Sequence, residues 1–396
     1  MSEIVIIAAR RTATGAFQGA LAEHSASDLG SRVIQALLKE SGVEASHISQ
    51  VIMGQVLTAG CGQNPARQSA LNAGLPVDTQ CLTVNKVCGS GLKAVHLGMQ
   101  ALKTGEAEFV IAGGQESMSN APHIATTSRS GTRLGNITLK DSLVSDGLWD
   151  AFNDYHMGIT AENVATEFGI SREMQDEYAL VSHHNALEAQ ARGIFEREII
   201  PVEWQTRKGE TISVERDEGP RATSIEKLTK LKPVFRKEGT VTAGNASSLN
   251  DGAAAVLLCT RETAEARDLP VLASLGVFSN SGIQPALMGA APIQAIADCL
   301  SRSGWKPEDV DHLESNEAFA AQALAAQALA VIQQTGISPD RINPYGGAIA
   351  LGHAIGASGC RILVTLVHSL IRNDARRGVA ALCVGGGEGV ALSVYR

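Results

Sequence analysis

Two cysteines and one histidine, far apart in the chain, each stand beside a glycine-rich turn. They lie in the segments VNKVCGSGLKA around Cys88, NPYGGAIALGHAIGASG around His353 and AALCVGGGEGVAL around Cys383. A cysteine that a histidine activates is a nucleophile, and a second cysteine can carry a proton. Together, the three segments predict acyl transfer through a sulfur atom.

The residues that follow Cys88 predict a helix. Their apolar members recur at helical spacing, and a glycine is placed to end the helix: Leu92, Val95, Met99, Leu102 and then Gly105. The unpaired N–H groups of the first turn would lower the pKa of the Cys88 thiol. Gly89 and Gly91 would let backbone amides approach a bound carbonyl. The alternative is a small buried hydrophobic residue, the usual state of a free cysteine.

The same turn also fits part of a dinucleotide-binding pattern. The run from Gly89 to Ala94, GSGLKA, has the form GxGxxA. It lies late in the chain, however, and no convincing ribose-binding acid ends the next strand. The interpretation of the chain as an NAD-dependent oxidoreductase therefore rests on this pattern alone, and a lack of NAD binding would exclude it.

The other candidate residues each allow a chemical and a structural interpretation. His353 has small neighbours and a near-neutral pKa, which suit a base, but it could also be a structural histidine bound to a carbonyl. Cys383 could shuttle a proton beside an oxyanion held by the Gly385 N–H, or be a core cysteine. Asn316 opens an alanine-rich helix and by itself predicts a helix cap.

Charge argues against nucleic acid as a partner. The formal net charge of the 396-residue chain is −8, and phosphate binding needs a basic face. Residues 205–240 are a local exception, with nine Lys/Arg and six Asp/Glu. This stretch is either a solvated surface or a landing site for a polyanionic ligand.

The cysteines predict free thiols and no metal site. There are seven, without a CxxC pair or zinc-like spacing to histidine, which indicates a reducing compartment. His183 and His184 are adjacent on a polar helix and so do not share a face for a metal. The N-terminal apolar run is too short for a signal peptide or a membrane span. We therefore expect a cytoplasmic protein with no metal and no membrane partner.

The chain repeats itself. Short β-branched runs at 4–8, 109–112 and 379–384 predict strands, and they alternate with helical patterns, as in layered α/β proteins. VIQALLKESGVEASHISQVIMGQ from Val33 resembles AIADCLSRSGWKPEDVDHLESNE from Ala295, so that Gly42 matches Gly304. Further on, Gly91 matches Gly359. We expect two similar halves, with the unmatched residues 121–248 as an insertion that covers the substrate.

Jointly these segments resemble the thiolase family over essentially the whole chain. The matching motifs include TATGAFQGAL, VNKVCGSGLKA, GGQESMS, HMGITAEN, TVTAGNASSLNDGAA, NEAFAAQ, GGAIALGHAIGASG and LCVGGGEGVAL. The resemblance implies a duplicated, layered α/β/α/β/α fold with an inserted loop domain. The implied domains are 1–120 with 249–270, a loop domain at 121–248, and 271–396. The family also implies a homo-oligomer, a dimer or a tetramer.

The family's catalytic roles carry over to this chain residue by residue. Cys88 resembles the acylated nucleophile, His353 the base that activates it, and Cys383 the acid/base at the α-carbon of acetyl-CoA. Asn316, through a water, and His353 resemble the oxyanion hole for the enolate. The N–H groups of Cys88 and Gly385 resemble the second oxyanion hole, at the acyl-cysteine. The resemblance implies reversible formation of acetoacetyl-CoA from acetyl-CoA without a prosthetic group.

His156 and Met157 are similar to the short-chain, biosynthetic branch, where the histidine borders the pantetheine sulfur and the methionine closes the acyl pocket. The resemblance implies further contacts with coenzyme A or the acyl group at Ser247, Arg221, Phe235, Met288, Ala318 and Phe319. Two rivals remain: a degradative 3-ketoacyl-CoA thiolase of broad chain length, and a non-catalytic acyl-CoA- or lipid-binding member of the fold. Met157 argues against the first, and the presence of all four catalytic side chains argues against the second.

The chain departs from the family pattern at three positions. Ala354 stands where proline usually follows the catalytic histidine. Ser248 replaces a glycine beside the CoA-contacting serine, and Glu388 replaces an apolar residue in the GGGxG turn. None of the three removes a catalytic atom.

Overall fold

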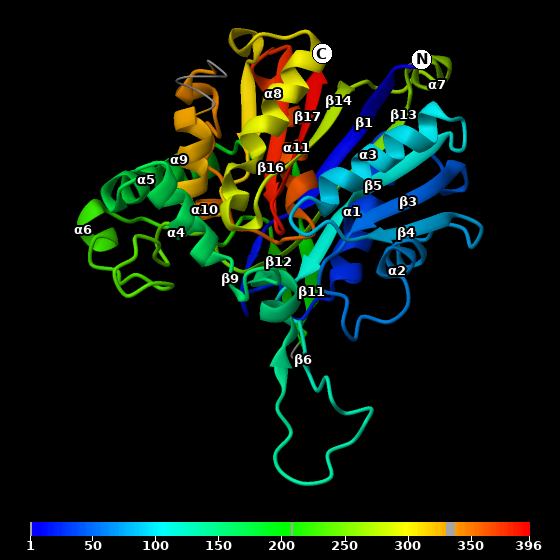
Figure 1. Ribbon diagram of the computed structural model, residues 1–396. Helices are drawn as coiled ribbons and strands as arrows, with labels where there is room; N and C mark the ends of the chain where they lie inside the picture. Colours follow the sequence, from blue (N-terminus) through cyan, green and yellow to red (C-terminus); the bar gives the residue numbers. More distant parts are fainter. Residues whose placement is uncertain (1, 207–208, 330–336) are drawn as a thin grey trace.

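The computed structural model of the chain describes residues 2–206, 209–329 and 337–396. Arg207 and Lys208, two of the cations in the predicted basic stretch, lie outside the described residues. Figure 1 shows a body of strands and helices from which one long hairpin projects.

One large mixed sheet runs through the body in the order β15-β16-β17-β14-β1-β13-β5-β3-β4, and the short strands β2 and β10 join it at β13 and β1. Its strands are β1 (Ile4–Thr12), β2 (Gly15–Ala16), β3 (Ile48–Gly54), β4 (Gln80–Val84), β5 (Phe109–Ser117), β10 (Ile199–Ile200), β13 (Asn250–Thr260), β14 (Ala273–Gly282), β15 (His312–Ser315), β16 (Arg377–Val384) and β17 (Glu388–Tyr395). All three predicted strand runs lie inside β1, β5 and β16, each of which extends beyond its run.

The duplication is confirmed by strand order. In the first half the strand order is β4-β3-β5-β13-β1, and in the second half β15-β16-β17-β14 correspond to β3-β5-β13-β1. In place of a counterpart to β4, a single β-bridge joins Leu313 to Ile342. The halves join where Ile4–Ile6 of β1 pair antiparallel with Ala273–Leu275 of β14. Helices α1 (Ala26–Ser41) and α8 (Ala291–Ser303) end alike, at left-handed Gly42 and Gly304 with φ of 68° and 67°. Glycine suits both ends because it has no Cβ to strain there.

Two helices fill the space between the halves. α3 (Ser90–Lys103) packs on β3 and β5, and α11 (Ser358–Arg372) packs on α3 and on strands of both halves. They cross closely, because a Cβ at Gly91 would lie 2.8 Å from the Cys360 nitrogen and one at Gly359 would lie 2.5 Å from the Leu92 nitrogen. The predicted end of α3 is confirmed within a residue, with Thr104 as its cap and Gly105 at φ 76°. With α1 and α8 on the outer faces, the layers are α/β/α/β/α.

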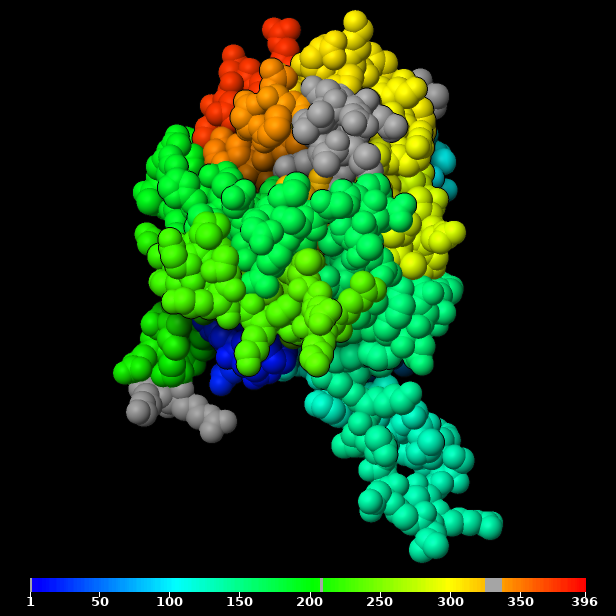
Figure 2. All heavy atoms as spheres, turned by 60° about the vertical axis from the view of Figure 1, so that its left-hand side comes forward, coloured from blue at the N-terminus to red at the C-terminus, as the bar shows by residue number. Residues whose placement is uncertain are grey.

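The insertion between β5 and β13 has helices and short strands of its own. Its elements are β6 (His123–Ile124), β7 (Lys140–Asp141), the π-helix η2 (Leu143–Leu148), β8 (Trp149–Asp150), β9 (Tyr155–His156), α4 (Gly158–Glu167), α5 (Arg172–Ala191), β11 (Val202–Gln205), β12 (Thr211–Val214) and α6 (Ile225–Leu228), besides β10. Much of it covers one face of the body, and the hairpin of β6 and β7 extends away from it (Figure 2). Because β10 pairs with β1, the insertion is also tied into the main sheet.

Shorter helices complete the two halves and their connections. They are α2 (Pro65–Asn72), α7 (Arg261–Ala266), η3 (Pro285–Ala290), α9 (Ala320–Leu329) and α10 (Ala348–Leu351), with single turns η1 (Ala45–His47), η4 (Pro307–Asp309) and η6 (Pro339–Arg341). Among the described residues, no helix has the length and apolar character needed to cross a membrane.

Candidate active site

Cys88 lies in a tight turn between β4 and α3. The side chain is buried, and the preceding residue, Val87, has a φ of +46°, a conformation that costs a β-branched residue free energy. A hydrogen bond from the Gly385 backbone favours the thiolate, but burial outweighs it and raises the pKa of the Cys88 thiol to about 11. The expectation of a lowered pKa is therefore wrong, because the helix begins two residues later and the sulfur is taken out of water.

His353 is held as a neutral base. Its Nδ1 lies 2.7 Å from the hydroxyl of Ser358, and that hydroxyl lies 2.9 Å from the Ala354 carbonyl oxygen, to which it donates. The Ser358 oxygen then accepts from Nδ1–H, which leaves the lone pair on Nε2. Nε2 is buried without a partner among the described residues. Burial, and secondarily the charge of Arg361, lowers the pKa of His353 to about 4.

Cys383 is the last residue but one of β16 and lies in an apolar cluster. It packs with Met157, Met288 and Ala318. Its thiol is 3.4 Å from the Oε1 of Gln322, which accepts its hydrogen. Burial raises the pKa of the Cys383 thiol far above its usual range, and the proximity of Cys88 adds to the rise. A thiolate formed here would be a strong base.

Asn316 follows β15 and caps no helix. Its backbone N–H donates to the Ala381 carbonyl at 2.9 Å, beside the strand that leads to Cys383, and α9 begins only at Ala320. The helix-cap interpretation is therefore wrong. Both side-chain polar atoms of Asn316 are buried and unpartnered within the described chain. Such atoms cost free energy unless a ligand or water binds them.

One cavity of about 560 Å³ brings most of the predicted residues together. Those that line it are Cys88, His353, Ser247, His156, Met157, Phe235, Met288, Ala318 and Phe319. The rings of His156 and Phe235 stack with centroids 4.7 Å apart. A hydrogen bond of 3.0 Å from the Ser247 N–H to the Ala318 carbonyl links two segments of the lining that are distant in sequence. Because aromatic and methionine side chains form much of its wall, the cavity is mostly apolar, as ligand pockets usually are.

Four predicted residues lie outside this lining. Cys383 and Gly385 lie just behind it, since Cys383 packs on Met157 and Met288 and a Cβ at Gly385 would come within 2.3 Å of the Met157 methyl. Asn316 lies two residues before Ala318. Arg221 is exposed and reaches the pocket edge, where its Nη2 is 3.5 Å from the carbonyl of Ala243.

Comparison with known proteins decides the family. Residues 4–262 match the description "Thiolase, N-terminal domain" and residues 269–396 match "Thiolase, C-terminal domain". The chain belongs to the thiolase family.

Its relatives match this thiolase from end to end. It is 55% identical to an acetyl-CoA acetyltransferase of Pseudomonas aeruginosa and 56% identical to a probable acetyl-CoA acetyltransferase of Escherichia coli, each over 100% of both chains. The cytosolic acetyl-CoA acetyltransferase of Rattus norvegicus is 50% identical over 99% of this chain and 98% of its own. The crystal structure of the Bacillus anthracis acetyl-CoA acetyltransferase superposes with a TM-score of 0.96 at 40% identity, covering 100% and 99% of the two chains.

The thiolase fold also brings to the site residues that sequence reasoning missed. The π-helix η2 supplies Leu143, Val144, Gly147 and Leu148 to the cavity wall, and Phe17 and Ile355 are among its other members. A π-helix has no familiar periodicity in sequence, so no pattern pointed to it. Ser358 was also missed, although a hydroxyl five residues after a candidate base is a signal that could have been used.

The three departures from the family pattern fit their surroundings. The hydroxyl of Ser248 is 2.9 Å from Oδ1 of Asn250, the same atom that accepts the His353 N–H at 2.8 Å. Ala354 keeps its carbonyl available to Ser358. Glu388 forms an ion pair of 2.6 Å with Lys86.

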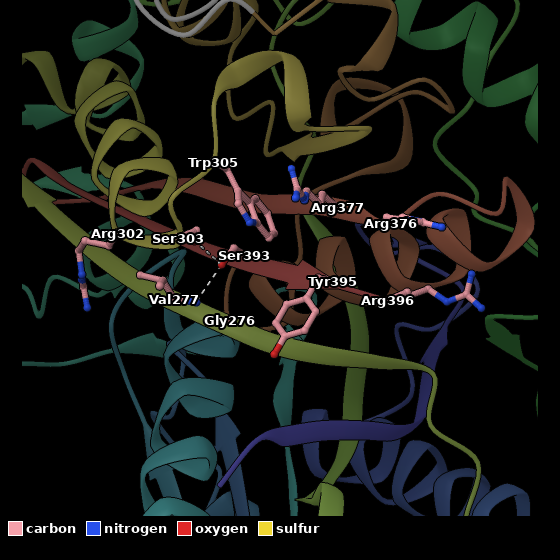
Figure 3. Close-up of a pocket in the computed structure, with 10 residues that line it drawn as sticks. All are labelled: Gly276, Val277, Arg302, Ser303, Trp305, Arg376, Arg377, Ser393, Tyr395 and Arg396. Atoms are coloured by element: carbon pink, nitrogen blue, oxygen red, sulfur yellow. Dashed lines mark hydrogen bonds between the residues drawn. The ribbon is translucent and has the colours of Figure 1, made fainter. Parts of the chain in front are cut away.

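A second hollow, of about 540 Å³, lies at the far end of the C-terminal half (Figure 3). Trp305 hangs over β17 there, and four arginines line the rim. They do not converge on one point. Arg302 lies at the opposite end from Arg376, and the guanidinium group of Arg377 is engaged by Asp309 at 3.1 Å. No metal-binding group of three or more His, Cys, Asp or Glu occurs in the described part of the chain.

Proposed function

We propose that this thiolase is an acetyl-CoA C-acetyltransferase, which joins two acetyl-CoA molecules to acetoacetyl-CoA and free CoA, reversibly, through acetyl-Cys88. The observation that carries the proposal is a single apolar cavity that holds Cys88 and the free Nε2 edge of His353, with Cys383 directly behind it. The full-length relatives named acetyl-CoA acetyltransferase support it.

In the first half-reaction the Cys88 sulfur attacks the thioester carbonyl. His353 Nε2 takes the Cys88 proton as the new carbon–sulfur bond forms, because a thiol with a pKa near 11 is not a thiolate on its own. The N–H groups of Cys88 and Gly385 stabilise the oxyanion. The bond to CoA breaks, Cys383 gives its proton to the departing sulfur, and CoA leaves as a thiol. His353 remains protonated and Cys383 becomes a thiolate.

In the second half-reaction the Cys383 thiolate removes an α-proton from a second acetyl-CoA. Protonated His353, together with Asn316 through a water, stabilises the enolate oxygen, and hydrogen-bond donors of this kind are worth about 3 kcal/mol each. The enolate carbon attacks the carbonyl of acetyl-Cys88, and Cys88 leaves as a thiolate that regains its proton from His353. Acetoacetyl-CoA forms, and every proton is back on its starting group.

The substrate's CoA portion occupies the remainder of the cavity. Ser247 and Arg221 contact it at the outer end, where the described cations of the basic stretch offer charge complementary to its phosphates. His156 borders the pantetheine sulfur, beside Phe235 and Phe319, while Met157 and Met288 close the acyl end. No prosthetic group takes part in this scheme.

Chain length separates this function from that of a degradative 3-ketoacyl-CoA thiolase. The test is CoA-dependent cleavage of acetoacetyl-CoA beside that of a 3-ketoacyl-CoA of about ten carbons. We expect rapid cleavage of the short substrate and a rate at least about 10-fold lower for the long one, since Met157 and Met288 block the extra methylenes. Similar rates would assign the protein to the degradative branch, and cleavage of neither would indicate a binding protein.

We propose that the protein forms a dimer or tetramer and is located in the cytoplasm. We also propose that residues 121–248 form the loop domain. Strand β4 supports oligomerisation because it lies at the edge of the sheet with Leu82 exposed. The projecting hairpin supports it too, since Leu134, Ile137 and Leu139 are exposed on it. All seven cysteines are free, as a reducing compartment requires.

A further inference from the structure

Two loops of the site approach each other from opposite halves of the fold. The turn Lys86–Gly89 belongs to the first half and carries Cys88, while the loop Gly385–Glu388 belongs to the second half and carries the Gly385 N–H. Their chemistry depends on relative position, because a donor stabilises an oxyanion only at hydrogen-bond distance. Whatever fixes one loop against the other therefore fixes the geometry of acylation.

Hydrogen bonds within and beside the turn Lys86–Gly89 fix its conformation, but they do not fix its position relative to the Gly385–Glu388 loop. The Ser90 hydroxyl donates to the Val87 carbonyl at 2.6 Å and accepts the Lys86 N–H at 2.8 Å. Asn85 accepts the Val87 N–H at 2.9 Å. These bonds hold Val87 at its unfavourable positive φ, and such a conformation lasts only where surrounding contacts enforce it.

Apolar contacts between the two loops set how close they can come. A Cβ at Gly89 would lie 2.8 Å from a methyl group of Val384, and one at Gly385 would lie 3.2 Å from a methyl group of Val87. Both glycines allow the close approach because they have no side chain. Such contacts prevent further approach, but they do not stop the loops from moving apart or sliding.

A directional interaction between side chains crosses the same gap, in addition to the hydrogen bond from the Gly385 backbone to Cys88. Lys86 Nζ lies 2.6 Å from Glu388 Oε2, with the lysine side chain only 19% exposed. Lys86 is two residues before Cys88, and Glu388 is three residues after Gly385. Glu388 also begins β17 and pairs with Val384 across the hairpin, so it is anchored to the strand that carries Cys383.

We propose that the Lys86–Glu388 ion pair is a positioning device that holds the Cys88 turn against the Gly385 loop. It rests on the proposed role of Cys88 as the acylated nucleophile. Neither side chain lines the substrate cavity, so both act on acylation through the loops and not through substrate binding. The acidic residue at position 388, which departs from the family pattern, thereby acquires a function specific to this chain.

The test compares removal of each charge with an exchange of the two charges, by the rate at which acetyl-CoA acetylates Cys88. Glu388→Gln and Lys86→Gln each remove one charge, and we expect each to lower the acetylation rate about 5-fold while the KM for acetyl-CoA stays unchanged. The exchanged pair, Lys86→Glu with Glu388→Lys, should recover at least half of the lost rate. The wild-type rate should also fall with added salt, and the Glu388→Gln rate should not.

A matched control is Glu108→Gln, which breaks an ion pair of the same length, 2.6 Å to Arg267, with a glutamate of similar exposure and away from the site. It should leave the acetylation rate unchanged. The proposal is overturned if Glu388→Gln matches wild type, or if the exchanged pair is no faster than the single charge reversals Lys86→Glu and Glu388→Lys. Acetylation of a Cys88→Ala protein would instead overturn the proposed function itself, so the two failures are distinguishable.

Discussion

At the scale of single residues, the resting site contains a neutral thiol and a neutral imidazole. Burial raises the pKa of Cys88 to about 11 and lowers that of His353 to about 4, so neither group is charged between those values. In the proposed mechanism, the proton of Cys88 moves to His353 only when substrate arrives and the N–H groups of Cys88 and Gly385 stabilise the new negative charge. A site of this kind protects its cysteine from oxidation, because the thiolate is the oxidisable form.

This predicts how the free enzyme titrates. A raised thiol pKa means that the thiolate is lost as pH falls through about 11, so little should exist near neutrality. The ultraviolet thiolate absorbance of wild type minus Cys88→Ala should stay near zero from about pH 5 to about pH 9. A full thiolate signal in this difference spectrum near pH 7 would show a thiolate–imidazolium pair and contradict the geometry described.

Ser358 is predicted to orient the base. Ser358→Ala removes the acceptor for His353 Nδ1–H and lets the ring adopt the tautomer with hydrogen on Nε2. Outer-shell changes of this type typically cost about 10- to 100-fold, and we expect that loss in the acetylation rate. Ser369→Ala is the matched control, since it removes a buried serine–histidine contact, to His312, on the same helix but away from the cavity. Equal rates for the two variants would count against the role of Ser358.

At the scale of secondary-structure elements, the turn between β9 and α4 forms the proposed acyl end of the cavity. Met157 stands there, 8% exposed, against Met288 and Ala318. Met157→Ala should enlarge the acyl end and raise cleavage of the ten-carbon substrate relative to acetoacetyl-CoA by about 10-fold. Met174→Ala, at an exposed position of helix α5, should leave the ratio unchanged. An unchanged ratio in Met157→Ala would mean that another element limits chain length.

Regular elements could be predicted from the sequence, and irregular ones could not. The apolar spacing of Leu92, Val95 and Met99 indicated α3, and the repeated Ser-Gly stops indicated the ends of α1 and α8, since these signals are local. The π-helix η2 and the protonation state of Cys88 depend on what packs around them. Burial by residues distant in sequence decides both, and no local pattern records it.

At the scale of the whole molecule, a buried ion network joins the insertion to the main sheet. Arg11 of β1 is fully buried, 2.7 Å from both Glu198 and Asp217, and Asp217 also accepts the Thr14 N–H at 2.7 Å. Removing one partner of such a network leaves an uncompensated buried charge. The insertion that forms much of the cavity thereby depends on β1 for its position.

Asp217→Asn should therefore lower the free energy of unfolding by about 3–5 kcal/mol. The adjacent pair Arg10–Glu40, at 2.7 Å but partly exposed, is the control, and Glu40→Gln should cost less than about 1 kcal/mol. Urea unfolding of the two variants measures the difference. Equal midpoints would show that the buried network does not hold the insertion.

The similarity of the two halves could be predicted from the sequence, but the pairing of strands between distant segments could not. Repeated segments around Gly42 and Gly304 predicted two similar halves, and the strand order confirms them. The sequence did not show that β10 of the insertion would pair with β1, or that β1 and β14 would join the halves into one sheet. Long-range pairing of short strands leaves little trace in composition.

The most direct test of the account is to mix the protein with acetyl-CoA alone, quench with acid and map acetyl groups by mass spectrometry of its peptides. We expect one acetyl group per chain, on the peptide that carries Cys88, and none in Cys88→Ala. The Cys383→Ala protein should still acquire the group but make no acetoacetyl-CoA. Acetylation at Cys383, or none on any cysteine of an active preparation, would contradict transfer through Cys88.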